Sequence, residues 1–567
     1  MEKDFRDVLL ERLNTAHDRL AYSFISDTGA VREVSYLQLL QRAVDIGAAL
    51  GTYARAGDRI VMLLPPGIDY VASFLGCWIH GFIAVPAYPP RKNQRAARTE
   101  NIIASAEPSV VIFDAPDAGG AAHLPSLCRD AEPMFLSSVR DGAVRVDDLD
   151  RYIADTMTDR RADDLVFLQY TSGSTGTPKG TMVSHDNLVH NSHEMSRKFR
   201  TSRDSTMVSW LPPYHDMGLI LGILQPLYVG FPSHLMSPAV FMQRPLQWLR
   251  RIAQTRATLS GGPNFAFDLC VRRAAELQND RIDLSSWEVA FNGAEPINPA
   301  TLRRFATTFK RYGFNARALH PCYGLAENTL MATGQDRVPE NDRSPRCFIA
   351  AADREDIADE PAAEIVSCGS SIPGQDLVIV NPATGEPCPE GTIGEVWITG
   401  RSVAKGYWQN PADTAATFRA TLAGRAHGPR YLRTGDLAET RNGEVYIRGR
   451  LKDIIIVRGV KYYPQDIERV IEEAHPQIRH GGYCAVFQSD EIQPESIAVV
   501  AEIAREHRRL DSDKLADTIR AVVTSEFRLR VSSVSILPPG RFPKTSSGKI
   551  PRNVIKTALL ERELSTA

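Results

Sequence analysis

The alternation of short β-rich segments with amphipathic helices is the feature of this sequence that most restricts its fold. RIVMLL (59–64) and FIAVPAY (82–88) flank the helical pattern of residues 66–81, and VVIFD (110–114) and LVFLQY (165–170) continue the series. Parallel strands need a long crossover connection, which is usually a helix. The alternation therefore predicts the α/β class, with a parallel sheet covered by helices.

Two changes along the chain suggest more than one domain. Residues 375–450 contain short strands separated by Gly, Asn and Pro, which is typical of a small antiparallel sheet or barrel. After GRLKD (449–453), strands and helices alternate again in a compact α+β pattern. A single core does not grow to the size of a 567-residue chain, so we expect at least two domains, with a boundary near Arg450–Asp453.

The composition argues against several classes of partner. Hydrophobic residues make up 43% of the chain and charged residues 24%, and the formal net charge is −2, which is unlike a protein that recruits nucleic acid or an anionic membrane by bulk charge. The eight cysteines form no C-x-x-C pair, so we expect neither a disulfide framework nor a zinc knuckle, and a reducing cytoplasm fits. The most apolar run, residues 71–88, is interrupted by His80, Gly81 and Pro86, so no membrane span is predicted.

The segment YTSGSTGTPKG (170–180) has the chemistry of a phosphate-binding loop. Its glycines let the backbone bend and present N–H groups, its hydroxyls add donors, and Lys179 adds a positive charge. The spacing is not that of a Walker loop, because Pro178 stands where the second glycine would be. Taken alone, the same composition also suits a flexible surface loop.

Four more segments follow this loop along the chain, namely YGLAE (323–327), TGD (434–436), GRLKD (449–453) and TSSGK (545–549). Together the five resemble the motifs of the adenylate-forming superfamily of acyl-CoA synthetases, luciferases and peptide-synthetase adenylation domains. The resemblance implies a large N-terminal region (1–449) of two α/β subdomains and a small β-barrel. It also implies a hinge (450–453) and a small, mobile α+β C-terminal domain (454–567).

Finer details resemble one branch of that superfamily, the fatty acyl-AMP ligases. These details are WLPPYHDMGLI (210–220), SGGPNFAFDLC (260–270), GVKYYPQDIE (459–468) and the polar segment 334–366 after YGLAE. In that branch an insertion near this place is associated with failure to use free coenzyme A. The resemblance implies that a fatty acid is the substrate and that the phosphopantetheine arm of an acyl carrier protein or polyketide synthase accepts the acyl group.

The resemblance also implies which residues hold ATP and Mg²⁺, the expected cofactors. Those expected at the triphosphate are Thr171, Ser172, Gly173, Ser174, Thr175 and Lys179, with Mg²⁺ near Thr175 and Glu327. Those expected at the nucleoside are Tyr323 and Gly324 against adenine, the backbone of Asn292, Gly293, Ala294 and Glu295 at the base edge, and Asp436 with Arg450 at the ribose.

The implied reaction explains why a lysine is needed. A carboxylate is a poor acyl donor because its leaving group would be oxide, whereas attack on the α-phosphorus of ATP forms acyl-AMP and expels pyrophosphate. Several negative charges meet, so catalysis depends on positioning and charge neutralisation. By resemblance, Lys549 bridges the substrate carboxylate and the ribose oxygen once the C-terminal domain closes. His215 is expected to gate the pocket near the carboxylate, although a histidine there is otherwise an ordinary core residue.

Three features depart from the pattern or compete with it. Ala326 stands where many relatives carry Thr, so a hydroxyl near the α-phosphate is missing or supplied elsewhere. Asp216 lies near the place where amino-acid-activating relatives hold an ammonium group. His185, His190 and His193 share a predicted helix but have no carboxylate or thiol beside them, so a metal site there is not expected.

Three functions remain open at this point. The leading one is a fatty acyl-AMP ligase, and the second keeps the chemistry but changes the acceptor or acid, as in an acyl-CoA synthetase or an amino-acid adenylating enzyme. The third is a nucleotide-binding module without turnover, against which Lys549, Asp436 and Glu327 argue.

Overall fold

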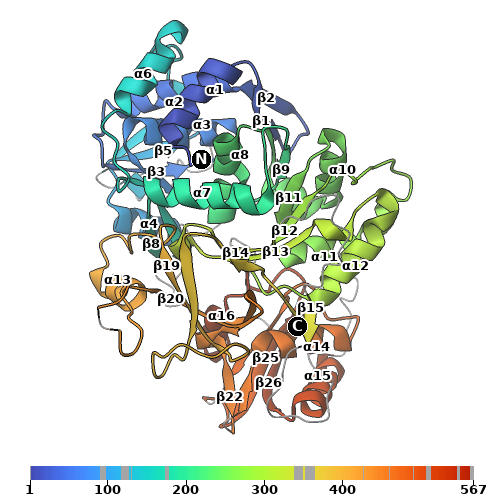
Figure 1. The fold of residues 1–567 in the computed structure, drawn as a ribbon. Helices are drawn as coiled ribbons and strands as arrows, with labels where there is room; N and C mark the ends of the chain where they lie inside the picture. Colours follow the sequence, from blue (N-terminus) through green and yellow to red (C-terminus); the bar gives the residue numbers. More distant parts are fainter. Residues whose placement is uncertain are drawn as a thin grey trace.

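The structure of the chain is a computed structural model, and most residues are described in it. The described ranges are 2–89, 97–115, 127–128, 131–172, 178–336, 349–351, 364–425, 427–458, 460–489, 491–505, 512–545 and 549–561. Two large sheets with their helices form the N-terminal part, and a smaller unit carries the C-terminus (Figure 1).

The first large sheet has six strands in the order β6-β5-β3-β4-β7-β8. Its strands are β3 (Arg59–Leu63), β4 (Ile83–Pro86), β5 (Val110–Phe113), β6 (Glu132–Phe135), β7 (Leu165–Ser172) and β8 (Pro178–Ser184). All neighbours from β6 to β7 are parallel, as the alternation predicts, and β8 returns antiparallel to β7. The described ends of the predicted phosphate loop thus lie in this antiparallel pair, at the end of β7 and the start of β8.

The second large sheet has nine strands in the order β17-β14-β13-β12-β11-β9-β10-β1-β2. Its strands are β1 (Leu20–Ile25), β2 (Val31–Ser35), β9 (Met207–Ser209), β10 (Ser233–Met236), β11 (Leu259–Gly262), β12 (Val289–Asn292), β13 (Leu319–Gly324), β14 (Met331–Gly334) and β17 (Ser370–Ser371). Within this order, the neighbouring strands from β13 through β12, β11, β9 and β10 to β1 are parallel. Their carboxyl ends therefore meet at one edge, where open α/β sheets bind ligands.

Helices cover these sheets; most share one large hydrophobic core with them, whereas α4 packs into a second, smaller cluster. They are α1 (Phe5–Ala16), α2 (Tyr36–Leu50), α3 (Ile68–His80), α4 (Ala97–Ala106), α6 (Leu149–Thr156), α7 (His185–Phe199), α8 (Gln225–Val229), α9 (Pro238–Gln243), α10 (Leu246–Thr255), α11 (Asn264–Arg272) and α12 (Pro299–Phe309). Helices α2 and α3 pack closely, and a Cβ atom on Gly76 would lie 2.5 Å from the carbonyl oxygen of Ala43. Glycine is therefore needed at this crossing.

The segment with short strands forms the predicted antiparallel sheet, in the order β18-β19-β20-β21. Its elements are β18 (Gln375–Val380), β19 (Gly394–Gly400), α13 (Pro411–Phe418), β20 (Leu432–Arg441) and β21 (Glu444–Arg450). Within the polar segment 334–366, the described residues include β15 (Ile349–Ala351), which pairs antiparallel with β16 (Glu364–Val366). Residues 337–348 and 352–363 of that segment lie outside the described residues.

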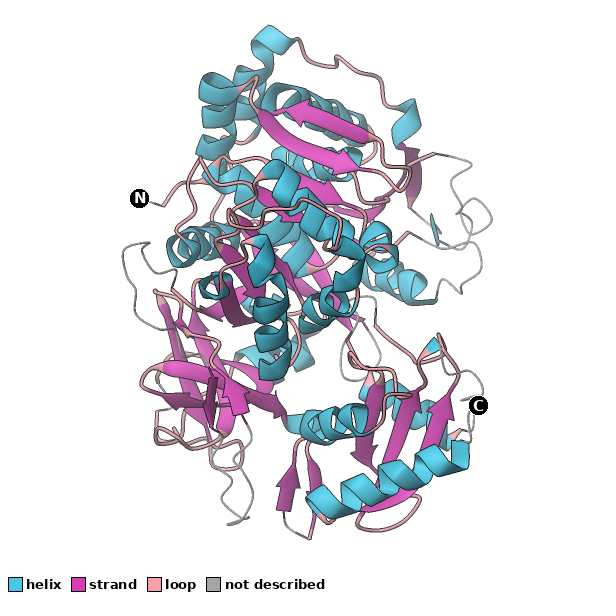
Figure 2. Ribbon diagram, turned by 90° about the vertical axis from the view of Figure 1, so that its right-hand side faces the viewer, coloured by secondary structure: helices cyan, strands magenta, loops and turns pink. Residues whose placement is uncertain are grey.

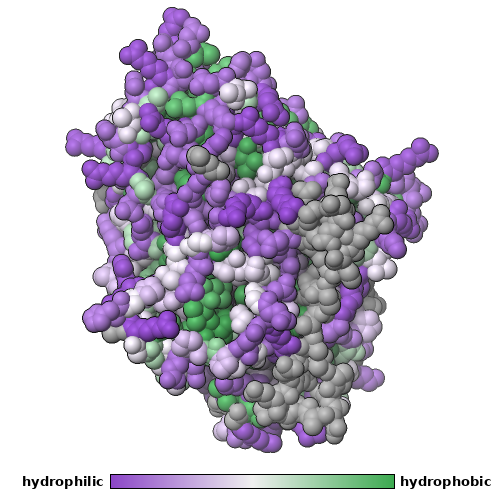
Figure 3. All heavy atoms as spheres, in the orientation of Figure 1, coloured by the Kyte–Doolittle hydropathy of each residue, from purple (hydrophilic) through white to green (hydrophobic). Residues whose placement is uncertain are grey.

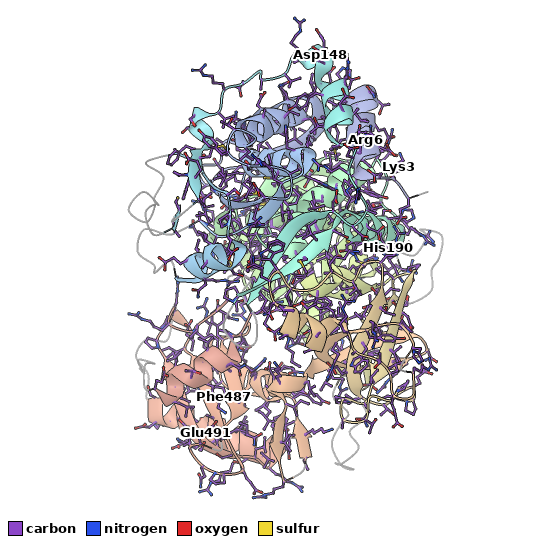
Figure 4. The ribbon with its side chains drawn as sticks, turned by 90° about the vertical axis from the view of Figure 1, so that its left-hand side faces the viewer. Lys3, Arg6, Asp148, His190, Phe487 and Glu491 are labelled. Carbon is purple, nitrogen blue, oxygen red and sulfur yellow. The ribbon has the colours of Figure 1, made fainter. Side chains whose placement is uncertain are left out.

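The C-terminal unit has its own hydrophobic core, to which Ile467, Val499 and Ile519 contribute. Its elements are β22 (Ile455–Val457), β23 (Val460–Tyr462), α14 (Pro464–Ala474), β24 (Cys484–Gln488), β25 (Ser496–Glu502), α15 (Ser512–Phe527), β26 (Arg530–Leu537) and α16 (Arg552–Leu560). Figure 2 shows this unit beside the rest of the chain, and in Figure 4 Phe487 and Glu491 lie at the opposite end of the molecule from Asp148. A short 3₁₀ turn, Leu451–Asp453, leads from β21 into the unit, at the place predicted for the hinge.

The face drawn in Figure 3 is predominantly hydrophilic, with small apolar patches between polar side chains. Across the described part of the chain, no helix has both the length and the apolar character needed to cross a bilayer.

Candidate active site

A cavity of about 1810 Å³ lies between the N-terminal part and the C-terminal unit. Each of the five motifs contributes to its wall, through Thr171 and Lys179, Tyr323 to Glu327, Thr434 to Asp436, Gly449 to Asp453, and Thr545 with Lys549. Segments that are far apart in the sequence therefore meet at one place, which makes this cavity the candidate active site.

A hydrogen-bonded cluster joins three of the predicted nucleoside-binding residues. The hydroxyl of Tyr323 donates to Oδ2 of Asp436 at 2.8 Å, and Nε of Arg450 donates to Oδ1 at 3.1 Å. The register of β20 and β21 places Asp436 directly opposite Arg450. Burial and the Asp436 charge raise the pKa of Tyr323 well above its usual value, and the Asp436 charge also raises the pKa of Arg450. The site thus holds a carboxylate that accepts from Tyr323 and Arg450 and whose oxygens can also accept from ribose hydroxyls.

The segment predicted to read the base edge follows β12 at the carboxyl edge of the large sheet. A Cβ atom on Gly293 would lie 2.8 Å from the carbonyl oxygen of Cys322, so only glycine fits there. Ala294 has φ of 69°, and Oε1 of Glu295 accepts from the backbone N–H of Phe265 at 2.7 Å. Burial raises the pKa of Glu295, while the Lys544 charge opposes this shift. Ala294 and Glu295 line the cavity, whereas Asn292 is fully buried at the end of its strand.

Only part of the predicted phosphate loop is described. Thr171 lies opposite Lys179 in the β7–β8 hairpin, and both line the cavity. The predicted roles of Gly173, Ser174 and Thr175 fall outside the described residues, as does the side chain of Ser172.

Lys179 has two neighbours that the sequence did not indicate. Its Nζ lies 2.7 Å from Oδ2 of Asp413 and 5.2 Å from the ring centre of Tyr407. The hydrogen bond with Lys179 lowers the pKa of Asp413. Asp413 and Tyr407 belong to a segment without a motif, so no local signal marked them.

Glu327 has the properties of a ligand for a divalent ion. It lies in the 3₁₀ turn Ala326–Asn328, and its Oε1 accepts from the Tyr407 hydroxyl at 2.9 Å. Burial raises the pKa of Glu327, whereas the hydrogen bond from Tyr407 and the Arg450 charge oppose this shift. A carboxylate in the wall of a cavity that also holds Lys179 suits Mg²⁺, which usually takes one or two carboxylates together with waters and substrate phosphates.

Lys549 lies in the cavity wall among charged groups. Burial, followed by the Arg450 charge, lowers its pKa, whereas the charges of Asp216 and Asp436 oppose the change. Its backbone N–H donates to Oγ1 of Thr545 at 2.9 Å, and its carbonyl oxygen accepts from the Thr545 N–H at 3.0 Å. These two hydrogen bonds to Thr545 hold the backbone of Lys549 at the wall of the cavity.

The WLPPYHDMGLI segment places Asp216, not His215, at the cavity wall. Asp216 accepts from the N–H of Met217 at 2.7 Å and caps a π-helical segment, Met217–Leu224. Burial raises the pKa of Asp216, and the Lys549 charge opposes this. His215 instead contacts Tyr88, with 3.3 Å between Nε2 and the tyrosine hydroxyl, and lies next to the cavity rather than in its wall.

The histidines of α7 have partners of their own. His185 Nε2 lies 2.9 Å from Oδ2 of Asp4, a carboxylate neighbour that the sequence did not indicate, and His190 Nδ1 lies 2.8 Å from Oγ of Ser402. Figure 4 shows His190 on this helix, above the antiparallel sheet. These contacts assign the two rings to packing between elements.

Comparison with protein families and curated proteins gives consistent matches. A family model described as AMP-binding enzyme matches residues 9–408, and one described as the AMP domain of Disco-interacting protein 2-like proteins matches residues 452–567. A medium-chain-fatty-acid–[acyl-carrier-protein] ligase of Moorena producens is 38% identical, over 98% of this chain and 95% of the relative. A long-chain-fatty-acid–AMP ligase of Mycobacterium marinum is 34% identical, over 97% of this chain and 96% of the relative.

Solved structures agree with these matches. A fatty acyl-adenylate ligase from L. pneumophila, crystallised with acyl adenylate and pyrophosphate, is 35% identical and has a TM-score of 0.72, with 98% of this chain and 96% of that chain covered. A structure from a study of fatty acyl-adenylate ligases from E. coli and L. pneumophila is 27% identical, has a TM-score of 0.82 and covers 99% of this chain and 98% of that chain.

Proposed function

Because the chain belongs to the AMP-binding enzyme family, we propose that it is a fatty acyl-AMP ligase that transfers its product to an acyl carrier protein. It activates a fatty acid with ATP to an acyl-adenylate and pyrophosphate. It then passes the acyl group to the thiol of a phosphopantetheine arm. The observation that carries this proposal is the meeting of Lys179, Glu327, Asp436 and Lys549 in one cavity.

In the first step, a carboxylate oxygen of the fatty acid forms a bond to the α-phosphorus of ATP, and the bond to the bridging oxygen of pyrophosphate breaks. Asp436 and Arg450 hold the ribose, and Tyr323 supports both the adenine and the Asp436 carboxylate. Lys549 neutralises charge between the carboxylate and the ribose oxygen as the anhydride forms.

The departing pyrophosphate also needs positive charge. Lys179 is the side chain of this chain placed to contact it, in exchange for its present partner Asp413. Mg²⁺, when bound at Glu327, would neutralise phosphate oxygens as a Lewis acid. Thr175 completes the proposed metal and phosphate site by resemblance.

In the second step, the acceptor sulfur bonds to the acyl carbon and AMP leaves with the electron pair of the anhydride bond. Met217, Leu221 and Phe265 contribute apolar surface to the same cavity, which suits an acyl chain. We place Arg450–Asp453 at the hinge, 454–567 in the mobile domain and the reaction in the cytoplasm. His215 is proposed to gate the pocket through its contact with Tyr88.

The test is pyrophosphate exchange with a panel of fatty acids, followed by product analysis with a holo carrier protein and with free coenzyme A. We expect fatty-acid-dependent exchange, acylation of the carrier protein and little acyl-CoA. Coenzyme A is tested in a separate reaction, because a 35% identical relative from Mycobacterium leprae bears the name putative fatty-acid–CoA ligase. Efficient acyl-CoA formation would reassign the acceptor, and no exchange with any acid would refute the activity.

A further inference from the structure

The segment of residues 404–408 holds together two parts of the site that are distant in sequence. It pairs with β8, the strand that carries Lys179, through hydrogen bonds from the Trp408 N–H to the Gly180 oxygen at 2.8 Å and from the Met182 N–H to the Gly406 oxygen at 2.9 Å. Its other end meets the metal-site turn, because the N–H of Ala404 donates to the carbonyl oxygen of Glu327 at 2.9 Å.

Tyr407, in the middle of this segment, repeats the connection with its side chain. Its hydroxyl donates to Oε1 of Glu327 at 2.9 Å, and its ring centre lies 5.2 Å from Nζ of Lys179. The residue is only 7% exposed, and its backbone N–H donates to Oγ1 of Thr414 at 2.9 Å, so its position is well defined. One side chain therefore contacts both the carboxylate and the lysine of the phosphate site.

We propose that Tyr407 is a positioning residue that orients the Glu327 carboxylate for a divalent cation bound with ATP. The inference rests on the function proposed above, and it concerns a residue outside the five motifs. A hydrogen bond to one oxygen fixes the plane of a carboxylate, and the outer partners of metal ligands commonly control metal affinity in this way. The ring of the same tyrosine also contacts the Lys179 ammonium group.

The test removes only the hydroxyl, with Tyr407→Phe. Tyr431→Phe is a matched control, because Tyr431 is also buried and donates to a carboxylate, Oδ2 of Asp376 at 2.7 Å, but lies outside the cavity wall. The affinity for ATP is measured by calorimetry on the full chain without fatty acid, once with Mg²⁺ and once with EDTA. The dissociation constant of ATP in EDTA divided by that in Mg²⁺ measures the coupling between metal and nucleotide.

We expect Tyr407→Phe to reduce this ratio about tenfold while leaving the dissociation constant in EDTA unchanged. Tyr431→Phe should match the wild type in both conditions. The Mg²⁺ concentration for half-maximal pyrophosphate exchange should rise in Tyr407→Phe by a similar factor. The proposal is overturned if Tyr407→Phe keeps the wild-type ratio, as it would if the variant bound ATP equally more weakly with Mg²⁺ and with EDTA. It is also overturned if the wild-type protein binds ATP no more tightly with Mg²⁺ than with EDTA.

A double-mutant cycle separates positioning from a direct role. If Tyr407 acts through Glu327, Tyr407→Phe causes no further loss of Mg²⁺ coupling in a Glu327→Gln background, whereas additive losses contradict the proposal. The calorimetric result does not depend on turnover. A wild-type protein without fatty-acid-dependent exchange would therefore refute the proposed function but leave this measurement decisive for Tyr407.

Discussion

At the scale of single residues, Lys549 is the group on which the proposed chemistry depends most. It is half-buried in the cavity wall, and the negative charges of Asp216 and Asp436 lie near it. We predict that Lys549→Ala lowers the rate of acyl-adenylate formation at least a hundredfold, the usual cost of losing a preorganised charge-stabilising group. Single-turnover formation of acyl-AMP measures the loss.

The same variant should still bind ATP. Asp436, Arg450 and Tyr323 form their cluster without Lys549, so the dissociation constant of ATP should stay near the wild-type value. Near wild-type adenylation by Lys549→Ala would exclude this residue as the catalytic lysine.

The lowered pKa of Lys549 has a consequence for the pH dependence. Burial and the Arg450 charge disfavour the protonated amine. Lys549 therefore loses its proton at a lower pH than an ordinary lysine, whose pKa is 10.5. We predict that kcat/KM for adenylation falls as the pH rises toward 10.5. In Lys549→Arg, whose guanidinium keeps its proton, this alkaline decrease should disappear even though the rate is lower. An identical alkaline decrease in both proteins would assign it to another group.

At the scale of elements, the start of α16 is tied to the proposed hinge. Nη1 of Arg552 lies 2.9 Å from Oδ2 of Asp453, and its Nη2 and Nε donate to the two oxygens of Glu468 on α14 at 2.6 and 2.8 Å. Arg552 follows Lys549 by three residues, so this ion-pair network joins the proposed hinge to the start of the helix that follows Lys549.

We predict that Arg552→Gln slows adenylation about tenfold, because hydrogen bonds to charged groups contribute about 1.5–3 kcal/mol each. Transfer from added acyl-AMP to a holo carrier protein should be affected less, since Lys549 is not needed there. Both half-reactions are measured separately.

Arg520→Gln is the control for this prediction. Arg520 pairs with Asp517 on the exposed side of α15 in the same unit, and surface pairs of this kind contribute little. Both half-reactions should stay at wild-type rates in Arg520→Gln. Equal losses in both half-reactions of Arg552→Gln would indicate a general loss of stability instead.

At the scale of the whole molecule, the polar segment after YGLAE is predicted to select the acceptor. The structure shows which parts of it the fold needs. Thr333 in β14 donates to the carbonyl oxygen of Cys368 at 2.8 Å, and Nε2 of Gln335 donates to the Ser367 oxygen at 3.3 Å. A deletion should therefore spare residues up to 336 and from 364 onward.

We predict that replacing residues 337–363 with a short Gly/Ser linker increases acyl-CoA formation while adenylation continues. Coenzyme A would then reach the acyl-adenylate without a carrier protein. A substitution of the same residues by an unrelated polar sequence of equal length controls for composition. A folded variant that adenylates but gains no activity with coenzyme A would contradict the predicted role of the segment.

The local sequence patterns predicted the helices and strands better than they predicted the contacts between side chains. The order β3, α3, β4 was readable because Arg59–Leu63 and Ile83–Pro86 are apolar runs on either side of a helical pattern. The six-stranded sheet is parallel as predicted except at β8, which pairs antiparallel with β7. Asp413 and Tyr407 could not be predicted, because their contacts arise only when residues 404–408 pair with β8.

The chemistry available to this protein follows from its amino-acid types and their spacing along the chain. The five motifs and their order indicate the adenylate-forming reaction, because glycines, hydroxyls, lysines and carboxylates bring their chemistry with them wherever they stand. Which side chains contact one another across long sequence distances depends on the tertiary structure. Asp436 meets Arg450 through strand register, Tyr407 joins Glu327 to Lys179, and Arg552 joins the hinge to α14. These contacts depend on the packing of sheets and helices over long sequence distances, which no local spacing encodes.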